Sequence, residues 1–452
     1  MVTARTMLRW GGAALLVLGL VAGGFAYGYL VHRNKLPPYA QIRKLAKSAG
    51  YRREARFTKA HPRIAEANRA RLDREAIGGE PKAGAEVDAQ TRQRLEALGY
   101  ASGTELAEAE LGVVAHNRER ALPGLNLYSS GHDAEALLMD MDGRVLHRWK
   151  RSVDEVWPDT EVGENQGYFR RVALVPGGGG DLLVIYSGRG IVRLDRSSNV
   201  VWKLHNHAHH DLSLDAHGTI YVLGREAKHI PRVDPTQAVL EDFLDVLTPE
   251  GRRLEHISLL EAFERSRYAP TLRYLLRDPN PFHTNTVKIL ENTELGEPFL
   301  AGRVMLSMRE LNTIAVLDPQ RREIVWALNG QWHRQHEPTV LDSGHVLIFD
   351  NRGKDKMSRV LELDPATQQV VWSYGGEAEN QFYSNSCGSA RRLSNGNTLI
   401  TESDRGRAFE VTPQREIVWE YLSPHRSPHR EELVATLFEM TRVTEPQEWL
   451  QP

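Results

Sequence analysis

The chain has a single cysteine, Cys387, among its 452 residues. An intramolecular disulfide is therefore impossible, and so is a zinc site built from several thiolates. An excess of charge of either sign is also missing, since 57 basic and 59 acidic side chains leave a formal net charge of -2. No global basic field points to a nucleic acid, and we expect no nucleic-acid partner.

Charged side chains are absent from one long stretch near the N-terminus, from Trp10 to Val31. At helical rise its 22 residues span about 33 Å, which is enough for the hydrocarbon core of a bilayer. A cleaved signal peptide is the alternative, but the apolar run is long and no clear A-x-A cleavage site follows it. We therefore predict an uncleaved transmembrane helix, a single-pass membrane anchor, within residues 1–34.

Basic residues flank this predicted anchor unevenly. Two precede it and five follow it: Arg5 and Arg9, then Arg33, Lys35, Arg43, Lys44 and Lys47. Counted simply, the positive-inside rule places the main domain in the cytoplasm. Residues 35–110 are rich in Arg, Glu, Ala and Gln, and we predict that they form a charged helical stalk between the anchor and the main domain.

From residue 111 onward the sequence repeats a unit of two short strands joined by a turn. Six copies are present, spaced 46 to 69 residues apart and ending at Trp149, Trp202, Ile257, Trp326, Trp372 and Trp419. A second hairpin with a glycine turn accompanies them, as in HEPTVLDSGHVLIF, so each repeat supplies four strands. This pattern predicts an all-β fold, a six-bladed β-propeller over residues 111–425. The tryptophans are interpreted as packing residues between neighbouring blades.

Two segments depart from the repeat. Residues 258–280 fill the longest gap and begin with the capping pattern SLLE, which predicts a helical insertion between the third and fourth blades. Residues 426–452 follow the last repeat, and we predict a mostly helical C-terminal tail.

Histidines recur at one position of the repeat. His210 lies eight residues before Gly218, His336 lies eight residues before Gly344, and His283 starts the corresponding strand of the blade between them. Because the innermost strands of a propeller line its axis, three successive blades are predicted to bring an imidazole to one mouth. His205, His207 and His209 lie outside this register and are interpreted as loop residues.

An anion-binding group accompanies the histidines. Arg309 follows the strand after His283, and a guanidinium offers a planar fork of donors to sulfate, phosphate or carboxylate. Asn285 lies two residues beyond His283 and shares its face of the strand. Together these residues predict an oxyanion pocket with an imidazole nucleophile.

The motifs HHDLSLD, FHTNT, MLSMRE and QHEPTVLDSGHVLIFDN resemble those of the bacterial arylsulfate sulfotransferase family, over roughly Asn126 to Trp419. The resemblance implies a six-bladed propeller that moves a sulfuryl group from an aryl sulfate ester to a phenolic acceptor. It implies a sulfohistidine intermediate, no nucleotide sulfate donor and no cofactor or metal. It also places the propeller outside the cytoplasm, in the periplasm or another extracytoplasmic space, against the simple charge count.

The resemblance also implies roles for single residues. His336 in QHEPTV matches the nucleophile, and His210 in HHDL matches a further active-site histidine. His283 and Asn285 in HTNT, together with Arg309 in SMRE, match the groups that hold the sulfuryl oxygens. The small-molecule donor and acceptor are the expected partners, beside the membrane, and a homo-oligomeric state is left open.

Two other functions remain as alternatives. Histidines around a propeller axis also hold iron or another divalent metal in some enzymes, although those sites use four histidines and here an arginine lies nearby. A non-catalytic binding propeller on a membrane stalk is the second alternative, because the fold alone does not determine function.

Overall fold

The computed structural model describes residues 87–88, 91–92, 95, 103–159, 167–275, 279–352, 357–445 and 447–450. All of them belong to one compact unit, Pro81–Pro452. The predicted anchor, residues 1–34, and most of the predicted stalk lie outside the described residues. Within the described part of the chain, no helix has both the length and the apolar character needed to cross a bilayer.

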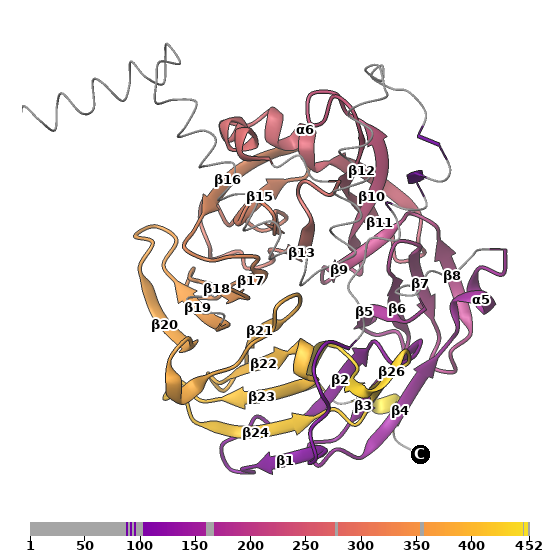
Figure 1. Ribbon diagram of the computed structural model, residues 1–452, viewed down its shortest axis with the longest axis vertical. Helices are drawn as coiled ribbons and strands as arrows, with labels where there is room; N and C mark the ends of the chain where they lie inside the picture. The colour runs from indigo at the N-terminus through magenta and orange to yellow at the C-terminus, as the bar shows by residue number, and fades with distance from the viewer. Residues whose placement is uncertain are drawn as a thin grey trace, which may run out of the picture. The chain divides into compact units, whose positions relative to one another are not determined.

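Six antiparallel sheets surround a common axis, which confirms the predicted six-bladed propeller (Figure 1). Blades two to five each use four consecutive strands, which follow one another in chain order from the axis outward. Blade two contains β5 (Phe169–Leu174), β6 (Leu182–Tyr186), β7 (Gly190–Leu194) and β8 (Val200–Leu204). Blade three contains β9 (Ala208–Leu214), β10 (Ile220–His229), β11 (Ala238–Leu247) and β12 (Arg253–Ser258). Blade four contains β13 (Thr284–Ile289), β14 (Val304–Met308), β15 (Thr313–Asp318) and β16 (Glu323–Asn329). Blade five contains β17 (His336–Val340), β18 (Val346–Asp350), β19 (Arg359–Leu363) and β20 (Val370–Gly375).

The two ends of the described chain close the ring in blades one and six. Blade one contains β2 (Leu125–Ser130), β3 (Glu135–Met139) and β4 (Val145–Lys150), and its innermost strand is β27 (Leu437–Val443). Blade six contains β21 (Ser389–Arg392), β22 (Thr398–Glu402), β23 (Arg407–Val411) and β24 (Ile417–Leu422), and β1 (Gly112–His116) pairs with its outer edge.

The predicted helical tail over residues 426–452 is therefore wrong for most of its length. It contains a hairpin of β25 (Arg426–Ser427) and β26 (Arg430–Val434), then β27, and only a short turn η5 (Glu448–Leu450) is helical. The physical reason is the inner edge of β2, whose unpaired backbone groups need a partner strand. The end of the predicted stalk is not helical either, since Leu106 bridges Leu433 beside β26.

The core lies between the blades rather than within one sheet. Six hydrophobic clusters fill the spaces between neighbouring blades, one at each interface. A central strand such as β6 is buried along its whole length because blades cover both of its faces. The outermost strand β8 alternates between half-buried and exposed residues, since it lies at the outer edge of its sheet.

Tryptophans that end the repeats connect neighbouring blades. The indole nitrogen of Trp149 donates to the carbonyl of Gly180 in blade two at 2.9 Å. Trp419 closes the ring in the same way, because its indole nitrogen donates to the carbonyl of Met141 in blade one at 2.9 Å. Both side chains are fully buried. These contacts agree with the interpretation of the tryptophans as packing residues.

Helical segments lie in the connections between blades. The insertion between blades three and four forms α6 (Leu259–Glu264) and the short 3-10 helix η1 (Ala269–Tyr274). The hydroxyl of Ser258 caps α6 by accepting from the backbone nitrogen of Glu261 at 3.1 Å. The other described helical turns are α5 (Val153–Val156), η3 (Ala378–Asn380) and η4 (Ser403–Arg405).

Charged side chains of alternating sign bridge the propeller axis. Each innermost strand contributes one of them, in the ring order Arg171, Asp211, Lys288, Glu337, Arg391 and Glu439. Arg171 is at the centre of this ring and pairs with Asp211 at 2.7 Å, with Glu337 at 2.7 Å and with Glu439. Lys288 lies 3.1 Å from both Asp211 and Glu337. We call these six residues the axial charge ring.

Candidate active site

His210 lies near the start of β9, His283 directly precedes β13, and His336 is the first residue of β17. These three strands are innermost strands of neighbouring blades (Figure 1). His210 and His283 have positive φ angles of 57° and 48°. Each of these strands also carries a register shift at this point, and such bulges re-aim the side chain at the cost of local strain. Asp211 and Glu337 of the axial charge ring follow His210 and His336 directly, so the ring forms the floor beneath the imidazoles.

His336 is buried, and its neighbours fix its tautomer. Its Nδ1 lies 2.6 Å from Oδ1 of Asn351 and 3.0 Å from the carbonyl oxygen of Arg334. The amide of Asn351 has one orientation only, because its Nδ2 donates to the carbonyls of Ser384 at 2.8 Å and Cys387 at 2.7 Å. Both neighbours of Nδ1 are thus acceptors, and Nδ1 must carry the proton.

The other nitrogen of His336 therefore presents a lone pair. Its Nε2 is buried and has no hydrogen-bond partner among the described residues. Burial, with the nearby Arg309 and Arg170, lowers the pKa of His336 to about 3, although Asn351 acts in the opposite direction. At neutral pH the ring is an uncharged imidazole with its reactive nitrogen unoccupied, which is the state that a nucleophile needs.

His210 and His283 are in direct contact, with 3.2 Å between their Nε2 atoms. His209 extends this pair, since its Nδ1 lies 2.6 Å from Nδ1 of His210. Beyond it, Nε2 of His209 lies 3.6 Å from Oδ1 of Asp242 on β11. Burial holds the pKa of His209, His210 and His283 well below the usual range, so all three are neutral.

Three buried arginines, Arg309, Arg170 and Arg225, lie near these imidazoles. Arg309 follows β14, and its Nε and Nη2 lie 2.9 and 2.6 Å from Oε1 of Glu310. Arg170 on β5 lies over the ring of Phe438, 4.8 Å from its centroid. Arg309 lowers the pKa of His283 and His336, and Arg170 lowers that of His210 and His336, so both act on the same group of imidazoles.

Asn285 is buried, and its amide nitrogen makes a hydrogen bond within the protein. Its Nδ2 donates to the carbonyl of Gln335 at 2.8 Å, just before His336. The structure thus ties the start of β13 to the start of β17 through this side chain. Its predicted role toward a sulfuryl oxygen stays a prediction.

The sequence analysis missed several residues that contact or lie near the histidines. Arg170 lies eight residues before Gly178, the same spacing that singles out His210 and His336, so the alignment contains this signal. Arg225, on β10, also lowers the pKa of His209 and His283. His209 belongs to β9 rather than to the predicted loop, and neither Asn351 nor Asp242 has a sequence pattern that points to an imidazole.

A metal fits these axial histidines poorly. Each N–N contact between them is a hydrogen bond that needs a proton, and three buried arginines repel a cation nearby. Among the described residues, one other group has ligand atoms close enough to share an ion: His132, Glu135 and His425. Both nitrogens of His132 are taken by Ser130 and Glu135, at 2.5 and 2.6 Å, and Glu135 also pairs with Arg148. That group is a saturated hydrogen-bond cluster.

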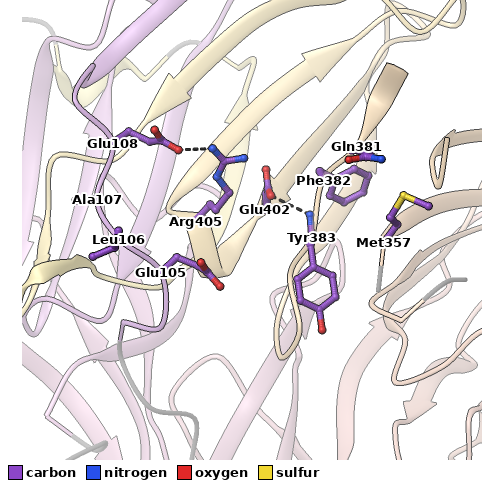
Figure 2. A pocket seen from close by; sticks show the side chains of 10 residues that line it. All are labelled: Glu105, Leu106, Ala107, Glu108, Met357, Gln381, Phe382, Tyr383, Glu402 and Arg405. Atoms are coloured by element: carbon purple, nitrogen blue, oxygen red, sulfur yellow. Dashed lines mark hydrogen bonds and ion pairs between the residues drawn. The ribbon is translucent and has the colours of Figure 1, made fainter. Parts of the chain in front are cut away.

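An open pocket of about 690 Å³ lies beside blade six. Figure 2 shows its acidic lining, with Glu108 paired to Arg405 and the backbone nitrogen of Tyr383 donating to Glu402 at 2.9 Å. None of the axial histidines is among the described residues that line it. It contributes nothing to the chemistry of the imidazoles.

Comparison with known protein families gives one match. The profile of a family described as "Arylsulfotransferase (ASST)" matches residues 178–424. A comparison with curated protein sequences finds no match.

The solved structures that match this chain are distant in sequence. A protein of unknown function from Bacteroides caccae is 11% identical, with a TM-score of 0.47, over 72% of this chain and 100% of that chain. The Dos1 propeller is 12% identical, with a TM-score of 0.38, over 73% and 77%. The Cps50 (Swd1) β-propeller domain of Myceliophteria thermophila is 12% identical, with a TM-score of 0.39, over 75% and 99%.

Proposed function

Because the chain belongs to the arylsulfotransferase family, we propose that it moves a sulfuryl group from an aryl sulfate ester to a phenolic acceptor through a sulfohistidine at His336. The observation that carries this proposal is the buried Nε2 of His336, which has a lone pair and no hydrogen-bond partner among the described residues. A buried polar atom without a partner is costly, and a bound substrate removes that cost.

The first half-reaction forms an N–S bond. The lone pair of Nε2 attacks the sulfur of the aryl sulfate, the bond between sulfur and the aryl oxygen breaks, and the phenolate leaves with the electron pair. The ring keeps its Nδ1 proton because Asn351 and Arg334 accept from it. The sulfated ring is therefore a cationic imidazolium bearing an anionic sulfonate, so neutral imidazole can depart in the second step.

The second half-reaction reverses the first with a new phenol. The acceptor oxygen attacks the sulfur, the N–S bond breaks, and its electron pair returns to Nε2. The guanidinium groups of Arg170 and Arg309 lie close enough to influence His336, and we propose that they stabilise the sulfuryl oxygens in both steps. No nucleotide sulfate donor, metal or cofactor enters this scheme.

A burst experiment tests the proposal. The protein is mixed with para-nitrophenyl sulfate without acceptor, and nitrophenolate release and intact mass are recorded. One equivalent of nitrophenolate and a mass increase of one sulfuryl group are expected, and His336→Ala should lose both. His345→Ala is the matched control, because His345 is a half-buried histidine of the same blade that pairs with Glu362 at 2.8 Å. A protein that releases no phenol from any aryl sulfate would refute the proposal.

The location of the propeller is a separate proposal, which rests on the sequence alone. We propose that Trp10 to Val31 anchors the chain and that the propeller lies outside the cytoplasm. C-terminal fusions to alkaline phosphatase and to green fluorescent protein report the side, since each is active on one side of the inner membrane. Fluorescence without phosphatase activity would place the propeller in the cytoplasm instead.

A further inference from the structure

The hydrogen bonds around His283, His210 and His209 have a single direction. Asn280 fixes this direction, because its Oδ1 accepts from the backbone nitrogen of His283 at 3.1 Å. This contact fixes the amide, so Nδ2 of Asn280 donates to Nδ1 of His283 at 2.9 Å. His283 is neutral and therefore carries its proton on Nε2.

The remaining protons follow from that one. His283 donates from Nε2 to Nε2 of His210, so the proton of His210 lies on Nδ1. His210 then donates from Nδ1 to Nδ1 of His209, across the short contact of 2.6 Å. His209 is left with its proton on Nε2, the atom that faces the carboxylate of Asp242.

Asp242 lies at the end of this row of hydrogen-bonded histidines, and it is a carboxylate in the core. It is 1% exposed, and its Oδ2 accepts from the backbone nitrogen of Thr284 at 2.7 Å. Its Oδ1 and Nε2 of His209 face each other at 3.6 Å, and neither atom has a hydrogen-bond partner among the described residues. An acidic group placed behind two aligned imidazoles holds their orientation and stabilises an imidazolium that forms there.

We propose that His209 and Asp242 complete a proton relay with His210 that serves the phenolic oxygen of donor and acceptor. The relay rests on the proposed sulfuryl transfer and deepens it. The phenolic oxygen takes the place of the contact between His210 and His283, accepting from Nε2 of His283 and donating to Nε2 of His210. His283 is the most exposed of the three histidines, so a substrate can approach the row of imidazoles from His283.

Each proton transfer in the relay is balanced. When the acceptor attacks sulfated His336, its O–H bond breaks and an N–H bond forms at Nε2 of His210. The Nδ1 proton of His210 passes to Nδ1 of His209, and the resulting imidazolium faces the carboxylate of Asp242. The proton taken from the acceptor stays on His209 beside Asp242 until the next donor half-reaction, in which the transfers run backward and the departing phenolate receives it. His210 is the catalytic base, while His209 and Asp242 act through it.

Leaving groups of different basicity test the relay. Unsubstituted phenolate is strongly basic and needs a proton when it leaves, whereas para-nitrophenolate leaves without one. Asp242→Asn should slow turnover of phenyl sulfate by roughly 100-fold and leave the burst with para-nitrophenyl sulfate within about threefold of the wild-type value. His209→Asn should give the same split, because its amide oxygen can still accept from His210 but cannot pass a proton on.

A second carboxylate of β11 provides the control. Asp245 is also 1% exposed, and it pairs with His256 at 2.6 Å, so Asp245→Asn makes the same change beside a different histidine. Equal losses with both donors in Asp242→Asn and in folded His209→Asn, or the same split in Asp245→Asn, would overturn the relay alone. A wild-type protein without a burst would overturn the proposed function and the relay with it.

Discussion

Replacing Asn351 with aspartate tests whether the neutral state of His336 sets the rate of sulfuryl transfer. With a pKa of about 3, the wild-type imidazole is about 1% protonated at roughly pH 5. In Asn351→Asp a carboxylate oxygen replaces the amide oxygen that lies 2.6 Å from Nδ1. An opposite charge at this distance raises the pKa of the imidazole by roughly 1–3 units. At the upper end, about one-tenth of the variant stays neutral at roughly pH 5.

The expected result is a change in the shape of the pH profile. The burst rate of the wild-type protein with para-nitrophenyl sulfate should be flat from about pH 8 down to about pH 5, since His336 stays neutral. The rate of Asn351→Asp should fall by up to about tenfold over the same range, because protonated imidazole has no lone pair for sulfur. Rapid quenching into base makes the released nitrophenolate visible at every pH.

Stability has to be measured beside the rate. Asn351→Asp loses the two hydrogen bonds to Ser384 and Cys387 and turns a carboxylate oxygen toward their carbonyl oxygens, so the cost exceeds the ~1 kcal/mol of each lost hydrogen bond. Asn126→Asp is the control, since Asn126 is also buried and lies on β2 of blade one, where its Oδ1 accepts from Nε of Arg442 at 2.8 Å. The reasoning fails if the wild-type rate itself falls with an apparent pKa near about 6.5, the value of an exposed histidine. It also fails if a folded Asn351→Asp keeps the wild-type profile.

Three further predictions concern the arginines, the acid stability and the axial charge ring. Arg309→Ala should lower kcat roughly 100-fold, and it should also lower the unfolding temperature because Glu310 loses its partner, so kcat is compared where the variant is folded. Arg303→Ala, at the other end of β14 beside Glu297, should leave kcat unchanged. Equal kcat values in the two variants would exclude a role for Arg309 in the transition state. Below about pH 6.5 the histidines of the unfolded chain bind protons, whereas the buried histidines of the folded protein stay neutral, so acid favours unfolding. For His336 alone, the free energy of unfolding falls by about 1.4 kcal/mol per pH unit down to its pKa of about 3. Urea midpoints should therefore fall from about pH 7 to about pH 5 and fall less steeply in His336→Gln, and parallel curves would contradict the lowered pKa. Lys288→Ala leaves Asp211 and Glu337 short of a counter-charge and should cost roughly 3–5 kcal/mol. Lys150→Ala removes an exposed pair with Asp133 and should cost less than about 1 kcal/mol in the same unfolding titration.

The repeat makes the fold predictable from the sequence. Each copy ends in the outermost strand of one blade, and the spacing to the hairpin glycine places His210 and His336 at the starts of β9 and β17. Period-two patterns and turn residues act locally, so they are visible without a structure. The helical insertion is visible for the same reason, through the capping residue Ser258.

The features that escape prediction depend on contacts between distant parts of the chain. β27 belongs to blade one, and its Thr441 donates to the carbonyl of Leu127, 314 residues away in sequence. Nothing in the local pattern of the tail reveals that partner, so the predicted helix is wrong there. Asn351 directly follows the second strand of its blade and Asp242 lies on the third strand of another, and only the three-dimensional structure shows that their side chains meet imidazoles.

The innermost strands carry both the candidate histidines and the axial charge ring. Asp211 and Glu337 follow His210 and His336 in the chain, so the strand start that presents an imidazole also supplies the charge ring beneath it. Arg171 reaches three carboxylates of this ring, and the buried ion pairs bridge the axis on one side of the histidines. If the ion pairs close the axis on that side, the phenol of the proposed reaction leaves by the opening through which its sulfate ester entered. Under the proposed mechanism the sulfuryl group stays on His336 while the phenol leaves and the acceptor arrives, so donor and acceptor can use one opening in turn.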